Sequence, residues 1–331
     1  MKSLMIVCCL LGVLAGCSSP TSTATPDGLV ESAGRSYPYK VVATVGMVAD
    51  IIQSVAGDRA KVQRLMGSGV DPHLYKATRD DVQAIMSGDI VFYSGLMLEG
   101  KMVDTLIKIS RTKPVYAVTE LLDEKSLLEP EDFQGHYDPH VWMDVSLWSD
   151  CVAVVAKSLS EFDPANANLY ATNAESYRKR LADLHSYGKA SIQSIPESSR
   201  VLITSHDAFN YLGRAYGLEV LGVQGISTES EAGLQQVNGL VDLIVARKIK
   251  AVFVESSVSP KNLLAILDGA KSRGHDVKIG GELFSDAMGS EGSYEGTYEG
   301  MLDHNITLVT RGLGGTAPEK GLHGKLSAPH P

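Results

Sequence analysis

Cysteine is scarce in this chain of 331 residues, which contains only four. Cys8 and Cys9 lie in an apolar N-terminal run, and Cys17 directly follows that run. Cys151 is the one thiol in the rest of the chain, where an apolar helical pattern predicts an inert packing role. A folded body with a single cysteine forms no internal disulfide, so its stability must come from apolar cores.

An excess of positive charge is also missing, because 30 Lys and Arg residues face 39 Asp and Glu residues and the formal net charge is −9. The sequence has neither a basic stripe nor an RNA-binding motif with interleaved aromatic residues, which argues against nucleic acid as a partner. It also has no HExxH motif, and "RGLGG" lacks the spacing of a nucleotide-binding loop. An acidic surface does not oppose the binding of cations.

The N-terminus has the features of an export signal. After Lys2, residues 3–16 form an uncharged, mostly apolar run of 14 residues, which is shorter than the about 20 that a transmembrane helix needs. The run ends in "LAGC", which resembles a bacterial lipobox and implies cleavage before Cys17 and a diacylglycerol on its thiol. A plain cleaved signal peptide is the alternative. We expect residues 1–16 to be a lipoprotein signal peptide and residues 17–37, rich in Ser, Thr, Pro and Gly, to be a flexible tether.

From Tyr39 onward, short apolar runs alternate with stretches of helical periodicity. This alternation predicts an α/β fold with two Rossmann-like lobes, mostly parallel sheets, and helices on both faces of each sheet. We expect an N-terminal lobe at 38–162, a C-terminal lobe at 196–311, and a disordered tail at 312–331, where Gly and Pro are dense. The predicted strands lie at 41–45, 62–66, 89–95, 114–119, 200–205, 218–223, 251–256 and 276–281.

One long helix is predicted between the two lobes. Asp163 is a favourable N-cap, and Pro164 is tolerated at the first helical position. Apolar residues then recur at steps of 4, 3, 4 and 3, which places them on one helical face: Tyr170, Ala174, Tyr177, Leu181 and Leu184. A helix over 165–194 would be about 45 Å long at about 1.5 Å per residue. The segment 163–195 would therefore form a backbone that joins the lobes.

Three histidines lie in loop-like settings far apart in the sequence. His73 and His140 each end an Asp-Pro-His motif, and His206 lies in "LITSHDAF". They follow the second and fourth predicted strands and the first strand of the C-terminal lobe. Ligands of open α/β sheets bind at the carboxyl ends of strands, so the three side chains should meet between the lobes. Proline before His73 and His140 fixes φ and would stiffen both loops.

Three neutral imidazoles suit a borderline divalent metal such as zinc, and one carboxylate would lower the charge of the site. Asp286, after the last predicted strand, is the candidate, and Glu282 competes with it from a position nearer the strand. Glu255 is a candidate for an outer carboxylate that contacts a ligand and not the metal. We expect the other histidines to be structural in the folded body and solvated in the tail: His136, His185, His275 and His304, and then His323 and His330.

Four segments together resemble the zinc/manganese solute-binding lipoproteins of bacterial ABC importers, of the TroA type: "GVDPHLYKATRDDVQAIMSGDIVFYSGLMLEGKM", "DPHVWMD", "VLITSHDAFNYLGRAYGL" and "GGELFSDAMG". The resemblance covers about residues 40–310 in the same order. It implies two α/β lobes joined by one long helix, with the metal between them on His73, His140, His206 and Asp286. Members biased to manganese have glutamate at the third histidine position, which is histidine here. Zinc-specific members often carry a long His- and acid-rich loop, and the corresponding segment here is only "DEKSLLEPEDFQGHYDPH". The resemblance therefore does not decide between zinc and manganese.

The resemblance implies a membrane-anchored, extracytoplasmic receptor without enzymatic activity. Such a receptor captures Zn²⁺ or Mn²⁺ with high affinity, as a monomer, and delivers it to an ABC permease and its ATPase. A metal-dependent hydrolase is one alternative, since three histidines with an open coordination position make a catalytic site. The neighbours Ser205, His206 and Asp207 do not form a catalytic triad, whose members converge from separate places. A surface adhesin is the other alternative.

Overall fold

The computed structural model describes residues 36–327 and contains two four-stranded parallel sheets. Lobe one holds the sheet with strand order β2-β1-β3-β4, and lobe two holds the sheet with order β6-β5-β7-β8. Every paired strand runs parallel, so the predicted α/β class with two parallel-sheet lobes is confirmed. The strands are β1 (Tyr39–Ala43), β2 (Ala60–Arg64), β3 (Ile90–Tyr93), β4 (Val115–Ala117), β5 (Val201–His206), β6 (Glu219–Gln224), β7 (Ala251–Glu255) and β8 (Lys278–Leu283).

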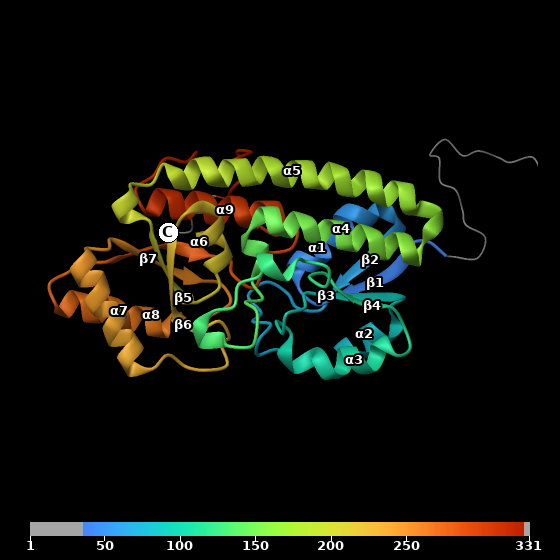
Figure 1. Cartoon of the computed structure of the whole chain (residues 1–331), viewed down its shortest axis with the longest axis horizontal. Coiled ribbons are helices and arrows are strands. Elements are labelled where there is room, and N and C mark those ends of the chain that lie inside the picture. Colours follow the sequence, from blue (N-terminus) through green and yellow to red (C-terminus); the bar gives the residue numbers. More distant parts are fainter. Residues whose placement is uncertain (1–35, 328–331) are drawn as a thin grey trace, which may run out of the picture.

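Helices cover both faces of each sheet (Figure 1). They are α1 (Gly46–Ala56), α2 (Arg79–Ser87), α3 (Val103–Ser110), α4 (Val145–Phe162), α5 (Ala167–Gln193), α6 (Asn210–Tyr216), α7 (Leu234–Arg247), α8 (Lys261–Ser272) and α9 (Tyr298–Gly312). Local sequence explains where several begin. Thr78 and Asp81 form the capping box that starts α2, and the Asp144 carboxylate accepts from the first backbone N–H groups of α4.

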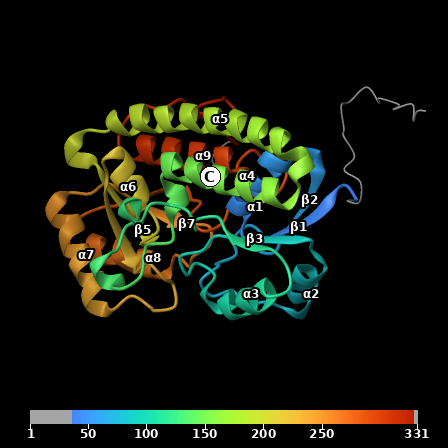
Figure 2. The ribbon, with the colours of Figure 1, turned by 45° about the vertical axis from the view of Figure 1, so that its right-hand side comes forward.

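The long helix is α5, which has 27 residues and runs along both lobes (Figures 1 and 2). Its buried face includes all five apolar residues that the sequence spacing placed together. The Tyr177 hydroxyl donates to the Asp50 carboxylate of α1 at 2.6 Å, and the Tyr187 and Thr307 hydroxyls lie 2.7 Å apart, which joins α5 to α9. One continuous apolar core extends from lobe one across α5 and α9 into lobe two. A shared, close-packed core therefore connects the two lobes, and the connection is not a single flexible linker.

The prediction of a disordered tail from Gly312 is wrong for residues 313–327. Ala317 and Leu326 are buried, and the Asp303 carboxylate accepts from the Leu322 backbone N–H at 2.8 Å. The Glu295 carboxylate accepts from the Ser327 backbone N–H at 2.6 Å. These contacts join residues that are far apart in the sequence, so the local density of Gly and Pro does not predict them.

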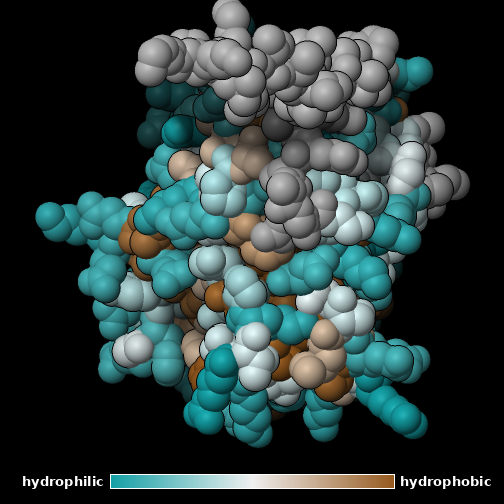
Figure 3. Space-filling view, turned by 90° about the vertical axis from the view of Figure 1, so that its right-hand side faces the viewer, coloured by the Kyte–Doolittle hydropathy of each residue, from teal (hydrophilic) through white to brown (hydrophobic). Residues whose placement is uncertain are grey.

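The outer end of lobe one is covered mostly by hydrophilic residues, with smaller hydrophobic areas between them (Figure 3). Within residues 36–327, none of the helices combines the length and the apolarity that crossing a bilayer requires. The proposed lipobox and Cys17 lie outside the described residues.

Candidate metal centre

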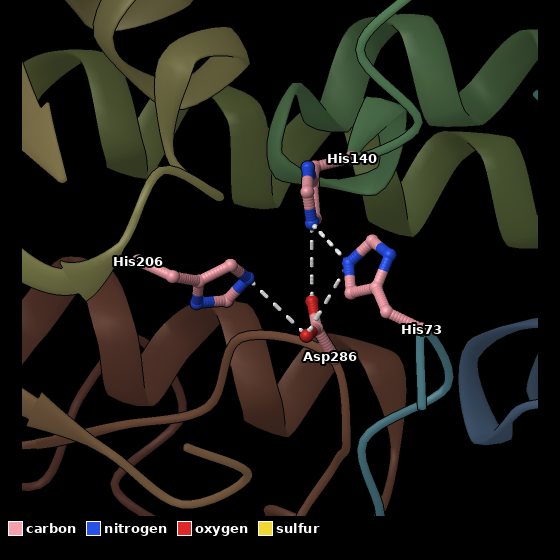
Figure 4. A group of neighbouring side chains, drawn as sticks. All are labelled: His73, His140, His206 and Asp286. Carbon is pink, nitrogen blue, oxygen red and sulfur yellow. Dashed lines mark hydrogen bonds and ion pairs between the residues drawn. The ribbon is translucent and has the colours of Figure 1, made fainter. Parts of the chain in front are cut away.

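His73, His140, His206 and Asp286 converge between the two lobes (Figure 4). Each offers one ligand atom, and these four atoms all lie within 4.8 Å of one another. His73 comes from the loop after β2 and His140 from the loop after β4, while His206 ends β5 and Asp286 follows β8. Each lobe thus contributes two side chains from the carboxyl ends of its strands, the edge that the sequence predicted.

Three separations between ligand atoms are close to those of a tetrahedral coordination shell, and a fourth is longer. Nε2 of His140 lies 3.3 Å from Nε2 of His73 and 3.3 Å from Oδ1 of Asp286. Oδ2 of Asp286 lies 3.2 Å from Nε2 of His206 and 3.8 Å from Nε2 of His73. Ligands about 2.0–2.1 Å from a tetrahedral zinc ion are about 3.3–3.4 Å apart. Both carboxylate oxygens face histidine nitrogens, so Asp286 can offer one ligand atom or two.

Each Asp-Pro-His motif forms the same local turn. The Asp71 carboxylate accepts from the His73 backbone N–H at 2.8 Å, and the Asp138 carboxylate accepts from the His140 backbone N–H at 2.9 Å. A short aspartate side chain that bonds two residues ahead stabilises a turn, and proline between the two residues fixes φ. The turn therefore presents the histidine ring outside any α-helix or strand.

Carboxylates also orient two of the imidazole rings. Nδ1 of His140 lies 2.7 Å from Asp138 Oδ1, and Nδ1 of His206 lies 2.5 Å from Glu255 Oε2. Glu255 accepts from the His206 backbone N–H as well, at 2.8 Å. A carboxylate that accepts at Nδ1 directs Nε2 toward a metal and raises its basicity. The expected outer role of Glu255 agrees with these contacts.

The pKa values of the histidine rings differ with their partners. Burial lowers the pKa of His73 to about 3, so its ring is neutral and ready to coordinate. Burial opposes the charged form of His140, but the carboxylates of Asp138 and Asp286 outweigh it and raise its pKa to about 9. Burial likewise opposes the charged form of His206, and Glu255 and Asp286 raise its pKa well above the ordinary value.

The carboxyl group of Asp286 is held as a carboxylate. Burial favours its neutral form, but the imidazoles of His206 and His140 outweigh burial and lower its pKa well below the usual range. A divalent ion that replaces one proton on His140 and one on His206 leaves the net charge of the centre unchanged, so the centre accepts such an ion without creating a buried charge imbalance.

All four side chains are buried, with exposed fractions of 5% for His73, 0% for His140 and His206, and 1% for Asp286. His206 Nε2 and both Asp286 oxygens lie at ion-pair distance from one another or from His140, but they make no well-directed hydrogen bond. Buried polar atoms without such bonds are costly unless another ligand satisfies them. A metal ion bound to all four groups would satisfy every one of these atoms.

Other sequence candidates lie outside the cluster. Glu282 is exposed, so it does not compete with Asp286 for the centre. Three further histidines bond to neighbouring groups as structural residues do: His185 to the Tyr216 hydroxyl, His275 to the Ile249 carbonyl and His304 to the Glu282 carbonyl. His136 and His323 are exposed, and His330 lies outside the described residues.

Sequence reasoning missed the roles of Asp71 and Asp138. It used the prolines of the two motifs to explain stiffness but assigned nothing to the aspartates. The repeated Asp-Pro-His pattern indicates this role, because an aspartate side chain two residues before a histidine can accept a hydrogen bond from the histidine backbone N–H. The contact of Asp138 with the His140 ring forms only when the turn has folded, so the residue spacing does not predict it.

The family model for the periplasmic zinc-uptake complex component A, ZnuA, matches residues 41–312. The chain is 46% identical over 304 residues to the manganese-binding lipoprotein MntA of Bacillus subtilis (strain 168), which covers 91% of this chain and 99% of MntA. It is 44% identical over 286 residues to the zinc-binding protein TroA of Treponema pallidum (strain Nichols), which covers 86% and 92% of the two chains. The solved structure of the periplasmic zinc-binding protein TroA from Treponema pallidum matches with a TM-score of 0.81 and 44% identity, over 83% of this chain and 99% of that one.

Proposed function

We propose, since the chain belongs to the ZnuA family of zinc-uptake components, that it is an extracytoplasmic receptor that captures Zn²⁺ or Mn²⁺ between its lobes for an ABC importer. The observation that carries this proposal is the buried cluster of His73, His140, His206 and Asp286. These four residues are the proposed metal ligands, and the ion is cargo and not a resident cofactor. Relatives named as zinc-binding and as manganese-binding proteins support both ions as candidates.

Binding without catalysis fits the centre better than metal-dependent hydrolysis does. A catalytic zinc site keeps a position for water, usually beside three protein ligands. Four protein groups surround this centre, and their nearly complete burial leaves little room for water or substrate. The donor set of three imidazoles and one carboxylate suits Zn²⁺, and purified affinity favours Zn²⁺ over Mn²⁺ whatever the physiological cargo.

The partners and the anchor follow from the same role. We propose that an ABC permease and its ATPase receive the ion, and that a diacylglycerol on Cys17 holds the receptor at the membrane surface. We also propose that it acts as a monomer, because the metal centre is complete within one chain. For domain organisation, we propose lobes at 38–162 and 196–311 joined by the segment 163–195, an arrangement that the two separate sheets support.

Metal analysis of the purified protein, with and without His206→Ala, tests the proposal. We expect one equivalent of Zn²⁺ or Mn²⁺ in the native protein and almost none in the variant, and we expect cells that carry only the variant to lose uptake of the radioactive ion. His304→Ala is the matched control, because that ring lies outside the centre. Equal metal content in native protein and His206→Ala, or normal uptake by the variant, would contradict the proposal.

A further inference from the structure

The metal centre is closed to solvent, so an ion can enter or leave only if part of its wall moves. His73 has the largest exposed fraction of the four ligands, although only 5% of it is exposed. Among the four ligands, the side chain of His73 is therefore the one nearest to solvent. Leu74, the next residue, is 45% exposed, which places the His73 loop at the protein surface.

The side of the metal centre that faces α5 is held more firmly than the His73 loop. Along α5, a continuous apolar core joins α1 and α9 to both lobes. In Figures 1 and 2 the loop between β6 and α7 lies on the side of the molecule away from α5. Opening at that loop disturbs polar contacts, whereas opening beside α5 disrupts close-packed side chains.

Two polar contacts cross between the lobes at the loop between β6 and α7. The Thr228 hydroxyl of lobe two donates to Oδ2 of Asp71 in lobe one at 2.6 Å. The Lys101 ammonium of lobe one lies 3.0 Å from Oε1 of Glu229, the next residue of lobe two. We name these four residues the interlobe latch.

Asp71 links the latch directly to a proposed metal ligand. Its Oδ1 accepts from the His73 backbone N–H at 2.8 Å, while its Oδ2 accepts from Thr228. A single carboxylate thus ties the His73 turn to the opposite lobe. Thr228 is buried, with 8% of its surface exposed, so its hydrogen bond is protected from water.

We propose that Thr228 is a positioning residue that, through Asp71, keeps the His73 loop closed over the ion and sets the rate of metal exchange. This proposal rests on the metal-binding function proposed above. A closed latch slows entry and release together, so its loss changes rates more than equilibrium affinity. The Lys101–Glu229 pair, which is more exposed, assists with a smaller, salt-dependent effect.

Stopped-flow release of Zn²⁺ from the full chain into a fluorescent chelator tests the latch. We expect Thr228→Val to raise the dissociation rate constant about tenfold, the effect of losing one hydrogen bond to a charged group. The association rate constant should rise with it, so that Kd changes less than about threefold. Thr228→Ser keeps the hydroxyl and should release Zn²⁺ at the native rate.

Glu229→Gln provides a second variant that leaves the buried hydrogen bond intact. We expect release about twofold faster at low salt and native release at high salt, because exposed pairs are screened. Glu219→Gln is the matched control, since it breaks a similar surface pair with Arg247 away from the centre. The dissociation rate of this control should equal the native rate.

Two results would overturn the latch. One is a native dissociation rate in Thr228→Val, and the other is a rise in Kd as large as the rise in dissociation rate with association unchanged, which would indicate distorted ligand geometry. Native protein that fails to bind Zn²⁺ at all would instead refute the proposed function, so the two failures are distinguishable.

Discussion

The two lobes are built on the same plan but hold their metal ligands differently. Each has a parallel sheet in which the first strand lies between the second and third, and each supplies two ligands from the carboxyl edge. Lobe one presents His73 and His140 on Asp-Pro-His turns within the loops that follow β2 and β4. Lobe two presents His206 on the last residue of β5 and Asp286 three residues after β8. One lobe thus relies on turn chemistry and the other on the sheet itself.

Their cores differ as well. The core of lobe one is continuous with α5 and α9, whereas lobe two has a second, separate core between its sheet and the helices α7 and α8. The boundaries of the apolar cores therefore do not coincide with those of the lobes. The metal centre lies beside the shared core, and the α7–α8 layer packs against a cluster of its own.

The largest effect should come from removing one ring from each lobe in turn. His140→Ala and His206→Ala should each weaken Zn²⁺ binding at least about a thousandfold, because each loses a ligand and leaves a buried carboxylate unpaired. Competition with a chelator of known affinity measures this loss. Near-native affinity in one of the two variants would show that the ring removed in it is not a metal ligand.

Acid should weaken binding by a comparable amount. Metal displaces a proton from His140, whose pKa is raised to about 9, and from His206, whose pKa is also raised, so affinity should fall about tenfold per pH unit for each proton displaced below these pKa values. His73, whose pKa is lowered to about 3, carries no proton to release near neutral pH and does not contribute to this pH dependence. Calorimetry in buffers of different ionisation enthalpy counts the protons, and we expect about two per ion at pH 7.

The stability of the metal-free protein should change with pH in the opposite direction. The pKa of His140 is raised from 6.5 to about 9 in the folded state, so its charged pairing stabilises the fold fully below pH 6.5 and is lost as the pH rises through 9. Thermal unfolding of metal-free protein from pH 6 to 9 should show this decline. A variant that lacks the ring, His140→Ala, should lose that part of the pH dependence.

Smaller effects should follow from the carboxylates behind the rings. Asp138→Asn in lobe one and Glu255→Gln in lobe two should each weaken Zn²⁺ binding about 10–100-fold, the usual cost of removing such a partner. Asp138→Asn also alters the His140 turn, so we expect it to have the larger effect. Equal losses in the two variants would mean that turn and strand present their histidines equally well.

The smallest effect on binding should come from the separate core of lobe two. Ile244→Ala in α7 and Ile52→Ala in α1 each create a cavity and should cost about 2–5 kcal/mol. Hydrogen exchange should localise the Ile244→Ala effect to α7 and α8, with Zn²⁺ affinity within about threefold of native. Faster hydrogen exchange in α5 of this variant, as well as in α7 and α8, would show that the two cores unfold together.

Sequence patterns predicted the helices and strands because these follow local rules, and the ligand set rested on the histidines after strands together with the resemblance to a known family. The spacing on α5, the capping box at Thr78 and the placement of histidines after strands needed no distant contact. Strand ends were less accurate: the first was predicted at 41–45 but pairs from Tyr39 to Ala43, because backbone pairing with β2 sets its start and apolarity does not. The packing of residues 313–327 and the contact between Thr228 and Asp71 join distant segments, which periodicity does not encode.

The continuous course of α5 along both lobes makes its residue count a geometric constraint on the metal centre. Inserting one residue in its middle would rotate all that follows by about 100° and advance it by about 1.5 Å. His206 and Asp286 lie after α5 in the chain, and His73 and His140 lie before it, so the two pairs would be turned away from each other. The register of one helix, which carries no ligand itself, thereby constrains how the two pairs of ligands face each other.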